Sequence, residues 1–337
     1  MKPSILVTGA SGFLGGRLAK FLPGVFPDHA IIGASRSASK AAGLEAVGCT
    51  FIQGDVADPD FCVEATRHAT AVVHCAALSA PWGSYEAFEK ANILTTQQLL
   101  SAAIQNKVER FVLIATPSVY FNFKSRSNVT EAEPLPSKMV NTYAATKLIA
   151  EQHTLTLNGQ GIQTVALRPR AIIGAEDTVI FPRLLKAYAD NKLRIIGSGK
   201  NKVDLTCVRN VLEAVVCALH APETAMGKSY NISNGEPVNM WEEINYVLSQ
   251  LGYAPLQAKA PYGVMMALAW VLEQIQYLTN PAKEPVLTRY SVAALSLSFS
   301  MDISQAQTHL GYRPVQSTRE GINEFIAWYK THLSKLA

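Results

Sequence analysis

Thr8-Gly9-Ala10-Ser11-Gly12-Phe13-Leu14-Gly15 is the stretch that decides the fold of this chain. It follows the apolar run Ile5-Leu6-Val7 directly and opens a helical stretch that begins at Gly16. Glycines at this GxxGxxG spacing permit a tight turn, let the backbone approach a pyrophosphate, and let the helix pack close to the strand. The phosphates then lie at a helix N-terminus, where free N–H groups and the helix dipole favour negative charge.

An ordinary strand–turn–helix corner is the alternative interpretation of these glycines. The strand before them, the helix after them and the βαβ pattern that follows favour a dinucleotide-binding site instead. The residues of this loop that we expect to contact the cofactor are Gly9, Ser11, Gly12, Phe13, Leu14 and Gly15.

Outward from the loop, short β-branched runs alternate with longer helical stretches from residue 4 to about residue 168. The runs are apolar on both faces, which is typical of central strands in a parallel sheet covered by helices. They lie at residues 5–7, 30–33, 50–52, 71–73, 111–114 and 164–167. Right-handed βαβ connections between such strands predict an α/β fold with a doubly wound parallel sheet, the Rossmann fold.

After Arg168-Pro169 this rhythm weakens, and the last hundred residues are rich in Met, Leu, Tyr and Trp. We expect a dinucleotide-binding domain formed by residues 1–172 and 203–234. A smaller, mainly helical substrate domain would be formed by residues 173–202 and 235–337. The apolar stretch from Tyr262 to Leu272 either lines the substrate pocket in that domain or is buried core.

Composition excludes several classes of protein. Of 337 residues, 48% are hydrophobic and 17% charged, against about 25% charged in an average domain, which excludes disorder and a coiled coil. The net charge of +4 is too small to indicate nucleic-acid binding. The five cysteines (49, 62, 75, 207 and 217) form no CxxC pair or disulfide framework. We therefore expect a reducing cytoplasm and no metal site.

Neither a signal peptide nor a membrane span is expected. Met1 to Gly9 reaches glycine too soon for a signal peptide. The longest apolar run, Gly263 to Leu272, is closed by Glu273, whereas a spanning helix needs about 20 apolar residues. The same stretch could still form a lid or a helix at a membrane surface. We therefore expect a cytoplasmic protein, with peripheral membrane contact as an open alternative.

The end of the second strand, Ala34-Ser35-Arg36-Ser37, predicts the cofactor. No Asp or Glu lies between Ile31 and Lys40 to bind the ribose hydroxyls of NAD, and an arginine suits the 2′-phosphate of NADP. We therefore expect NADP(H), with NAD(H) as the second choice, hydroxyl bonds from Ser35 and Ser37, and more distant charge from Lys40. Alternatively, Arg36 stacks on the adenine or is a solvated loop residue.

Tyr143 and Lys147 are separated by four positions and share one helix face. A lone YxxxK is weak evidence, but Thr116 follows the fifth strand, and ligands bind at strand ends in such sheets. A hydroxyl, a phenol and an ammonium that meet there form a proton-transfer site. We expect Lys147 to lower the pKa of Tyr143 toward working pH, and Thr116 to hold a carbonyl oxygen.

On these residues the chain resembles an extended short-chain dehydrogenase/reductase over nearly its whole length. The strings that carry the resemblance are Thr8 to Gly15, Gly54-Asp55-Val56, Val73-His74-Cys75-Ala76-Ala77, Asn92, Tyr143 with Lys147, and Leu167-Arg168-Pro169. The resemblance implies that Asp55 binds the adenine amino group and that Ala76 and His74 line the cofactor channel. Val56, Ala77, Tyr143, Lys147 and Pro169 complete the implied cofactor contacts, with Lys147 bonding the nicotinamide ribose. The family's catalytic serine corresponds to Thr116, with Ser118 as the alternative.

Further strings resemble the 3β-hydroxysteroid dehydrogenase-like branch of that family. They are residues 203–211, 230–237, 287–290, 301–304 and 310–314, with Arg209 where the first string usually has an acid. The bacterial 2-alkyl-3-oxoalkanoate reductases are most similar, and steroid and sterol-carboxylate dehydrogenases follow. The resemblance implies a homodimeric enzyme that interconverts a ketone and a secondary alcohol on a large apolar substrate, a 2-alkyl-3-oxoalkanoate or a 3-ketosteroid.

Two other functions remain open at this point. A nucleotide-sugar epimerase or dehydratase would share Tyr143 and Lys147, but it needs polar and basic groups for a nucleotide diphosphate, and residues 261–298 are mostly apolar. A non-catalytic NADP-binding regulator has no need for the intact Tyr143 and Lys147 pair.

Overall fold

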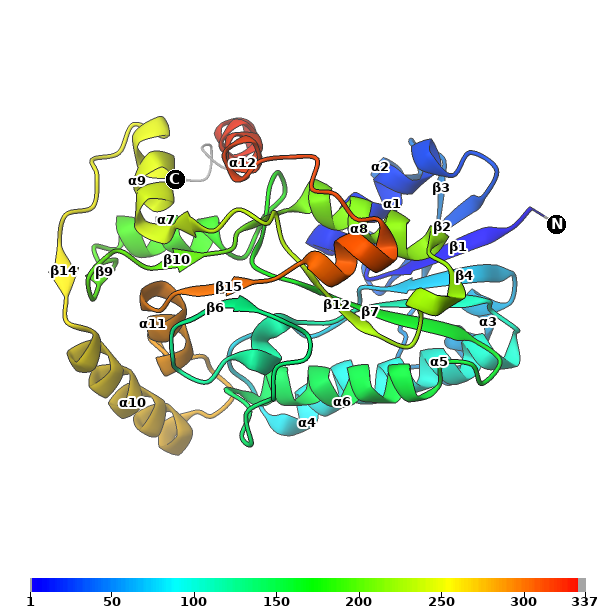
Figure 1. Cartoon of the computed structure of the whole chain (residues 1–337), viewed down its shortest axis with the longest axis horizontal. Helices are drawn as coiled ribbons and strands as arrows, with labels where there is room; N and C mark the ends of the chain where they lie inside the picture. The colour runs from blue at the N-terminus through cyan, green and yellow to red at the C-terminus, as the bar shows by residue number, and fades with distance from the viewer. Residues whose placement is uncertain (1, 333–337) are drawn as a thin grey trace.

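The computed structural model describes residues 2–332, and a seven-stranded parallel sheet is its centre, in the order β12-β7-β5-β4-β1-β2-β3 (Figure 1). The strand order reverses between β1 and β4, which is the point where doubly wound sheets bind dinucleotides. The predicted Rossmann fold is confirmed. The strands are β1 (Ser4–Thr8), β2 (Ala30–Ser35), β3 (Cys49–Gln53), β4 (Ala69–His74), β5 (Arg110–Ile114), β7 (Gln163–Pro169) and β12 (Ser229–Ile232).

Helices cover both faces of this sheet because alternate strand side chains point to opposite faces. On one face Val7 and Val73 pack in a core with α1, α2 and α8, and on the other Leu6 and Val72 pack with α3 and α5. Figure 1 shows α1 and α8 on one side of the sheet and α5 and α6 on the other. The helices are α1 (Phe13–Val25), α2 (Ala41–Glu45), α3 (Pro59–Thr66), α5 (Thr95–Gln105), α6 (Thr142–Thr156) and α8 (Val208–His220).

A second group of elements lies beyond the carboxyl ends of these strands. Its helices are α7 (Phe181–Ala189), α9 (Met240–Gln250), α10 (Tyr262–Thr279), α11 (Arg289–Ser296) and α12 (Thr318–His332). It also contains a four-stranded sheet, β13-β10-β15-β6, made of β13 (Val238–Asn239), β10 (Lys202–Val203), β15 (Phe299–Met301) and β6 (Arg126–Val129). The predicted helical character is confirmed, but the sheet adds β6 from the segment between β5 and α6.

Short elements connect the two groups. The strand pairs are β8 (Ile172–Ile173) with β11 (Thr206–Cys207), and β9 (Ile195–Ile196) with β14 (Lys259–Ala260). The remaining short helices are α4 (Tyr85–Phe88), the π-helices η1 (Glu89–Leu94) and η4 (Ala306–Leu310), and the 3₁₀-helices η2 (Pro117–Tyr120) and η3 (Glu223–Ala225). The proposed domain boundaries stay a prediction.

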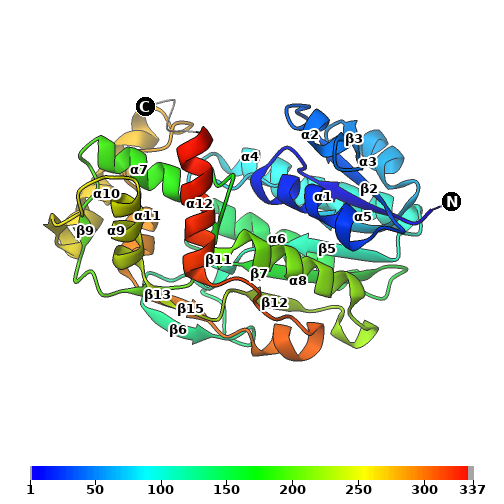
Figure 2. The ribbon, with the colours of Figure 1, turned by 90° about the horizontal axis from the view of Figure 1, so that it is seen from above.

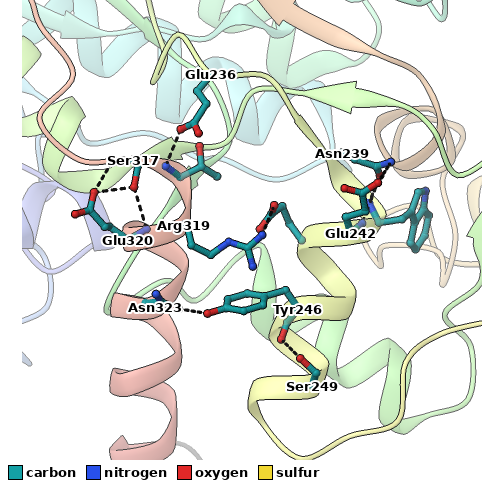
Figure 3. Close-up of polar contacts among 12 residues, drawn as sticks. Glu236, Asn239, Glu242, Tyr246, Ser249, Ser317, Arg319, Glu320 and Asn323 are labelled. Carbon is teal, nitrogen blue, oxygen red and sulfur yellow. Dashed lines mark hydrogen bonds and ion pairs between the residues drawn. The ribbon is translucent and has the colours of Figure 1, made fainter.

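Polar contacts hold α9 against α12, as Figure 3 shows. Arg319 of α12 donates to Glu243 of α9 at 2.8 Å, and its guanidinium lies 3.7 Å from the centre of the Tyr246 ring. The Tyr246 hydroxyl donates to Asn323 at 2.8 Å. The other side of α12 contacts the seven-stranded sheet and its covering helices, the first group of elements, because Glu324 pairs with Arg17 of α1 at 2.6 Å. Helix α12 therefore connects the two groups (Figure 2).

Candidate active site

The glycine loop forms a cradle that side chains would fill. Gly9 has a φ of 71°, and a Cβ there would lie 2.9 Å from the Ala76 nitrogen. A Cβ on Gly15 would overlap the Gly9 carbonyl oxygen. Helix α1 begins at Phe13 with Gly12 as its N-cap, so its first N–H groups face this cradle. The residues present therefore fit a pyrophosphate at the helix N-terminus.

Arg36 and Lys40 lie differently at the edge of this cradle. Arg36 is exposed at the end of β2, and its side chain makes no ion pair or hydrogen bond with the described residues. Lys40 instead pairs with Glu176 at 2.6 Å and donates to the Gly12 carbonyl at 3.3 Å. A carboxylate thus partly compensates the Lys40 charge, and the expectation that Lys40 adds distant charge for a 2′-phosphate stays a prediction.

The other cofactor residues expected from the sequence lie at carboxyl ends of neighbouring strands. Asp55 follows β3, and its carboxylate accepts from the Ala57 nitrogen at 3.0 Å; Val56 comes next. Ala76 and Ala77 follow β4, and the Ala76 nitrogen donates to the Thr8 hydroxyl at 3.2 Å. Pro169 ends β7 and is buried. The fold brings all of these residues to one edge of the sheet.

His74 is a buried residue beneath this edge. Its ring nitrogens lie 2.7 Å from the Thr8 hydroxyl and 3.2 Å from the Thr96 hydroxyl. Burial, with a smaller effect of the nearby Lys147 charge, lowers the pKa of His74 to about 3, so the imidazole is neutral. His74 therefore supports the strand ends from below and does not line the cofactor channel. The residues described contain no cluster of three side chains suited to hold a metal ion.

Tyr143 lies near the start of α6, where Asn141 caps the helix by accepting from the Ala144 nitrogen at 2.9 Å. Burial raises the pKa of Tyr143 above its ordinary value, while hydrogen bonds to the Thr116 and Ser79 hydroxyls lower it in part. The expectation that the pKa of Tyr143 is lowered toward working pH is wrong, because removal of the phenol from water raises this pKa. At neutral pH the phenol therefore carries its proton.

Thr116, rather than Ser118, is the hydroxyl in contact with Tyr143. Thr116 donates to the Ser118 oxygen at 3.1 Å, and Ser118 lies 3.3 Å from the Tyr290 hydroxyl. Ser118 therefore links the pair to Tyr290 of α11.

Lys147 lies one turn along α6 from Tyr143 and is buried. Its ammonium donates to the Ile114 carbonyl at the end of β5, at 2.6 Å. Burial lowers the pKa of Lys147 to about 8, although the negative charge of Glu151 opposes this shift. The protonation state of Lys147 therefore changes within the range of pH in which enzymes are studied.

The sequence did not point to Ser79 or Tyr290 as site residues, and it gave Asn92 no role. The Asn92 amide accepts from the Leu78 nitrogen at 2.8 Å and donates to the Thr146 hydroxyl at 3.1 Å. It therefore ties the loop that carries Ser79 to α6. Tyr290 belongs to a string that the family resemblance included, which is the one signal that could have identified it.

A cavity of about 90 Å³ lies at the start of α6, with Asn141 and Thr142 in its wall. Its wall combines polar and charged residues, among them Asn141, Thr142, Glu273 and Arg289, with the aromatic residues Trp82, Phe88, Phe123, Tyr277 and Tyr290. Trp82 donates to the Pro281 carbonyl at 2.8 Å, and its ring lies 4.4 Å from that of Tyr277, centre to centre. The loop after β4 thus closes against α10 over this cavity.

Helix α10 is neither buried core nor mainly pocket wall. Glu273 and Tyr277 line the cavity, and Glu273 pairs with Arg289 at 2.6 Å. The large apolar side chains of the opposite face are exposed, with Leu268 46%, Ile275 51% and Leu278 87% accessible. No helix among the described residues is long and apolar enough to cross a membrane. Arg209, which stands where the family string of residues 203–211 usually has an acid, pairs with Glu213 on the surface of α8.

Comparison with known proteins identifies the family. Residues 6–260 match the model of the 3-beta hydroxysteroid dehydrogenase/isomerase family. The chain belongs to this family. It is an extended short-chain dehydrogenase/reductase and an NAD(P)-dependent oxidoreductase, which confirms the family resemblance and the enzyme class inferred from the sequence.

Relatives of this dehydrogenase/reductase cover nearly the whole chain. It is 34% identical to the 2-alkyl-3-oxoalkanoate reductase of Stenotrophomonas maltophilia, over 96% of this chain and 98% of that protein. It is 34% identical to the 3beta-hydroxysteroid-dehydrogenase/decarboxylase isoform 1 of Arabidopsis thaliana, over 82% of this chain and 66% of that protein. The UDP-glucuronic acid 4-epimerase of Bacillus cereus, in complex with NAD, shares its fold at a TM-score of 0.73, with 24% identity over 97% of this chain and 99% of that chain.

Proposed function

We propose that this enzyme is an NADP(H)-dependent reductase that interconverts a ketone and a secondary alcohol on a large apolar substrate, a 2-alkyl-3-oxoalkanoate in preference to a 3-ketosteroid. The observation that carries the proposal is the contact between Tyr143 and Thr116 beside an aromatic cavity. The similarity to two bacterial 2-alkyl-3-oxoalkanoate reductases, at 34% and 32% identity, supports the substrate class.

The side chains divide the work of this reaction. The nicotinamide, when bound, supplies or accepts the hydride. Thr116 donates a hydrogen bond to the substrate oxygen, and the protonated phenol of Tyr143 gives it a proton as it becomes an alkoxide. Lys147 keeps positive charge beneath the site, and the aromatic wall excludes water from it. The residues that would hold the dinucleotide are those of the glycine loop with Arg36, Asp55, Val56, Ala76, Ala77 and Pro169.

The substrate proposal is tested by following NADPH absorbance with matched 3-oxo acids and 3-ketosteroids. Contact with the aromatic rings of the cavity wall should improve binding by up to ~0.8 kcal/mol for each added methylene. The expected result is a kcat/KM that rises with chain length until the cavity is full. A flat series, or a clear preference for nucleotide sugars, would overturn the proposal.

NADP(H) is the proposed cofactor because Arg36 is an exposed arginine with no acid beside it on β2. Its guanidinium can meet a 2′-phosphate with paired N–H groups, and a hydrogen bond to a charged group contributes about 1.5–3 kcal/mol. We expect roughly 10- to 150-fold preference for NADPH, most of which Arg36→Ala removes. Measuring kcat/KM with NADPH and NADH in both proteins tests this, and equal use by the wild type would contradict it.

Peripheral contact between α10 and a lipid surface is also proposed. The exposed face of α10 combines apolar side chains with Trp270 and carries no charge, and Lys259 and Lys283 stand exposed beyond its two ends. Such a helix suits the interface of an anionic bilayer. Co-sedimentation with anionic and with neutral vesicles measures this, and no binding to either would contradict it.

A homodimer in the cytoplasm is the proposed state of the enzyme. Leu94 and Ile149 are exposed apolar side chains on η1 and α6, which pack against each other and offer a surface for a second copy. All five cysteines are free thiols, as expected in a reducing compartment. Light scattering on the purified enzyme gives its mass, and a monomer at micromolar concentration would contradict the dimer.

A further inference from the structure

Arg170 is the first residue after β7, at the sheet edge that carries the candidate active site. β7 runs parallel to β5 with Leu167 opposite Ile114. Adjacent strands lie about 4.8 Å apart, so the chain leaves β7 at Arg170 beside the point where it leaves β5 at Thr116. The main chain is fixed there because the Arg170 nitrogen donates to the Ile232 carbonyl at 3.2 Å.

The guanidinium of Arg170 has no ion pair or hydrogen bond with any residue that the structure describes. Its Nε is buried without an acceptor, and its central carbon lies 4.4 Å from the centre of the Phe299 ring. Burial lowers the pKa of Arg170, although the nearby Tyr290 and Asp204 oppose the shift; arginine nevertheless stays charged in proteins. Arg170 is partly exposed, so the rest of its guanidinium can offer N–H groups to an acceptor from outside the chain.

The aromatic rings around Arg170 connect it to the catalytic hydroxyls. Phe299 packs on Phe121 with ring centres 5.9 Å apart, and Phe121 packs on Tyr290 at 5.7 Å. The Tyr290 hydroxyl lies 3.3 Å from Ser118, which bonds to Thr116. A continuous set of contacts through Phe299, Phe121 and Tyr290 therefore links Arg170 to the hydroxyls of Ser118 and Thr116.

We propose that Arg170 binds the carboxylate of the substrate, so that the enzyme prefers 3-oxo and 3-hydroxy carboxylates to neutral ketones and alcohols. In such acids the carboxyl carbon is separated from the reacting carbon by a single carbon, so both groups must be bound within a few ångströms. The N–H fork of a guanidinium matches the two oxygens of a carboxylate. This inference rests on the proposed function and names the residue that selects the substrate class.

The test runs the reaction in the direction of oxidation, where the substrates are chemically stable. A 2-alkyl-3-hydroxy acid and its methyl ester are each oxidised by NADP⁺ to the ketone, which yields NADPH and one proton. The expected kcat/KM of the wild type is ~10- to 150-fold higher for the acid than for the ester, the range expected for a hydrogen bond to a charged group. Arg170→Met should remove this preference and leave the ester unchanged, whereas Arg170→Lys should keep part of it.

Arg183→Met is the matched control, since Arg183 is an exposed arginine of α7 paired with Glu284 at 3.4 Å. It should leave the ratio of acid to ester unchanged. Two results would overturn the proposal. One is a wild type that uses acid and ester equally, and the other is an Arg170→Met enzyme that loses activity on both in parallel. Either result would show that Arg170 only supports the fold beside Asp204. A wild type that binds NADPH but oxidises neither compound would overturn the proposed function itself, and the carboxylate site with it.

Discussion

At the scale of single residues, Tyr143 is the proton donor that the proposed reaction depends on most. Tyr143→Phe removes one oxygen and keeps the ring that lies 6.4 Å from Phe88, centre to centre. We expect turnover to fall at least ~100-fold, the low end for a general acid, while NADPH binding stays the same. Steady-state kinetics measures the turnover, and fluorescence titration measures the binding of NADPH. Turnover near that of the wild type would show that another group gives the proton.

We predict that Lys147 gives the activity a pH dependence whose direction follows from the burial of its ammonium. Because burial lowers its pKa to about 8, its ammonium is present below that pH and is lost above it. We expect kcat/KM for ketone reduction to fall as pH rises through about 8, since this parameter reports the free enzyme. Tyr143 does not explain this change, because its pKa is raised. In Lys147→Arg, which stays charged, the change should disappear; its persistence would contradict the assignment.

At the scale of elements, two of the three glycines in α1, Gly15 and Gly24, have opposite roles. A Cβ on Gly15 would overlap the Gly9 carbonyl oxygen, whereas a Cβ on Gly24 meets no atom within 4 Å. Gly15→Ala should therefore displace the loop and weaken NADPH binding strongly. Gly24→Ala, the matched control, should leave binding unchanged and stabilise the fold by up to ~1 kcal/mol. Thermal unfolding with and without NADPH distinguishes the two variants. Equal effects of both substitutions on NADPH binding would contradict the role of the glycine loop as a cofactor cradle.

At the scale of the whole molecule, Glu176 connects the loop after β8 to α1 and to the residue that precedes α2. Its carboxylate pairs with Lys20 at 2.9 Å and Lys40 at 2.6 Å. Although burial opposes the shift, hydrogen bonds to Lys40 and Lys20 lower the pKa of Glu176 below 4.5. Glu176→Gln should cost up to ~1 kcal/mol of stability at pH 7, because the pairs are only partly buried.

The pH dependence of this loss follows from the direction of the shift. A carboxylate with a lowered pKa stabilises the fold above its unfolded pKa, and that stabilisation is lost as pH falls. The difference between Glu176→Gln and wild type in urea unfolding should therefore shrink below pH 4.5. Glu213→Gln, which removes a surface pair with Arg209, is the control with a smaller effect. A difference that grows in acid would contradict this role.

The sequence by itself determined the sheet, the glycine loop and the identity of the Tyr143 and Lys147 pair. These features depend on local chemistry: β-branched runs form strands, glycines permit the turn before α1, and four-residue spacing puts two side chains on one helix face. The family strings extended the prediction to a substrate class, and one of them, residues 287–290, contributes to the wall of the cavity.

Only the tertiary structure decided the electrostatics of the site and the exposure of α10. The pKa of Tyr143 depends on burial and on hydroxyls from two other segments, Thr116 and Ser79, and the charge of Lys40 depends on Glu176, 136 positions away. Helix α10 is apolar nearly all round, so its periodicity could not say which face is covered. Likewise, Arg170 is notable only because the fold leaves its Nε buried without an acceptor. Such properties are set by neighbours distant in sequence, which no local pattern encodes.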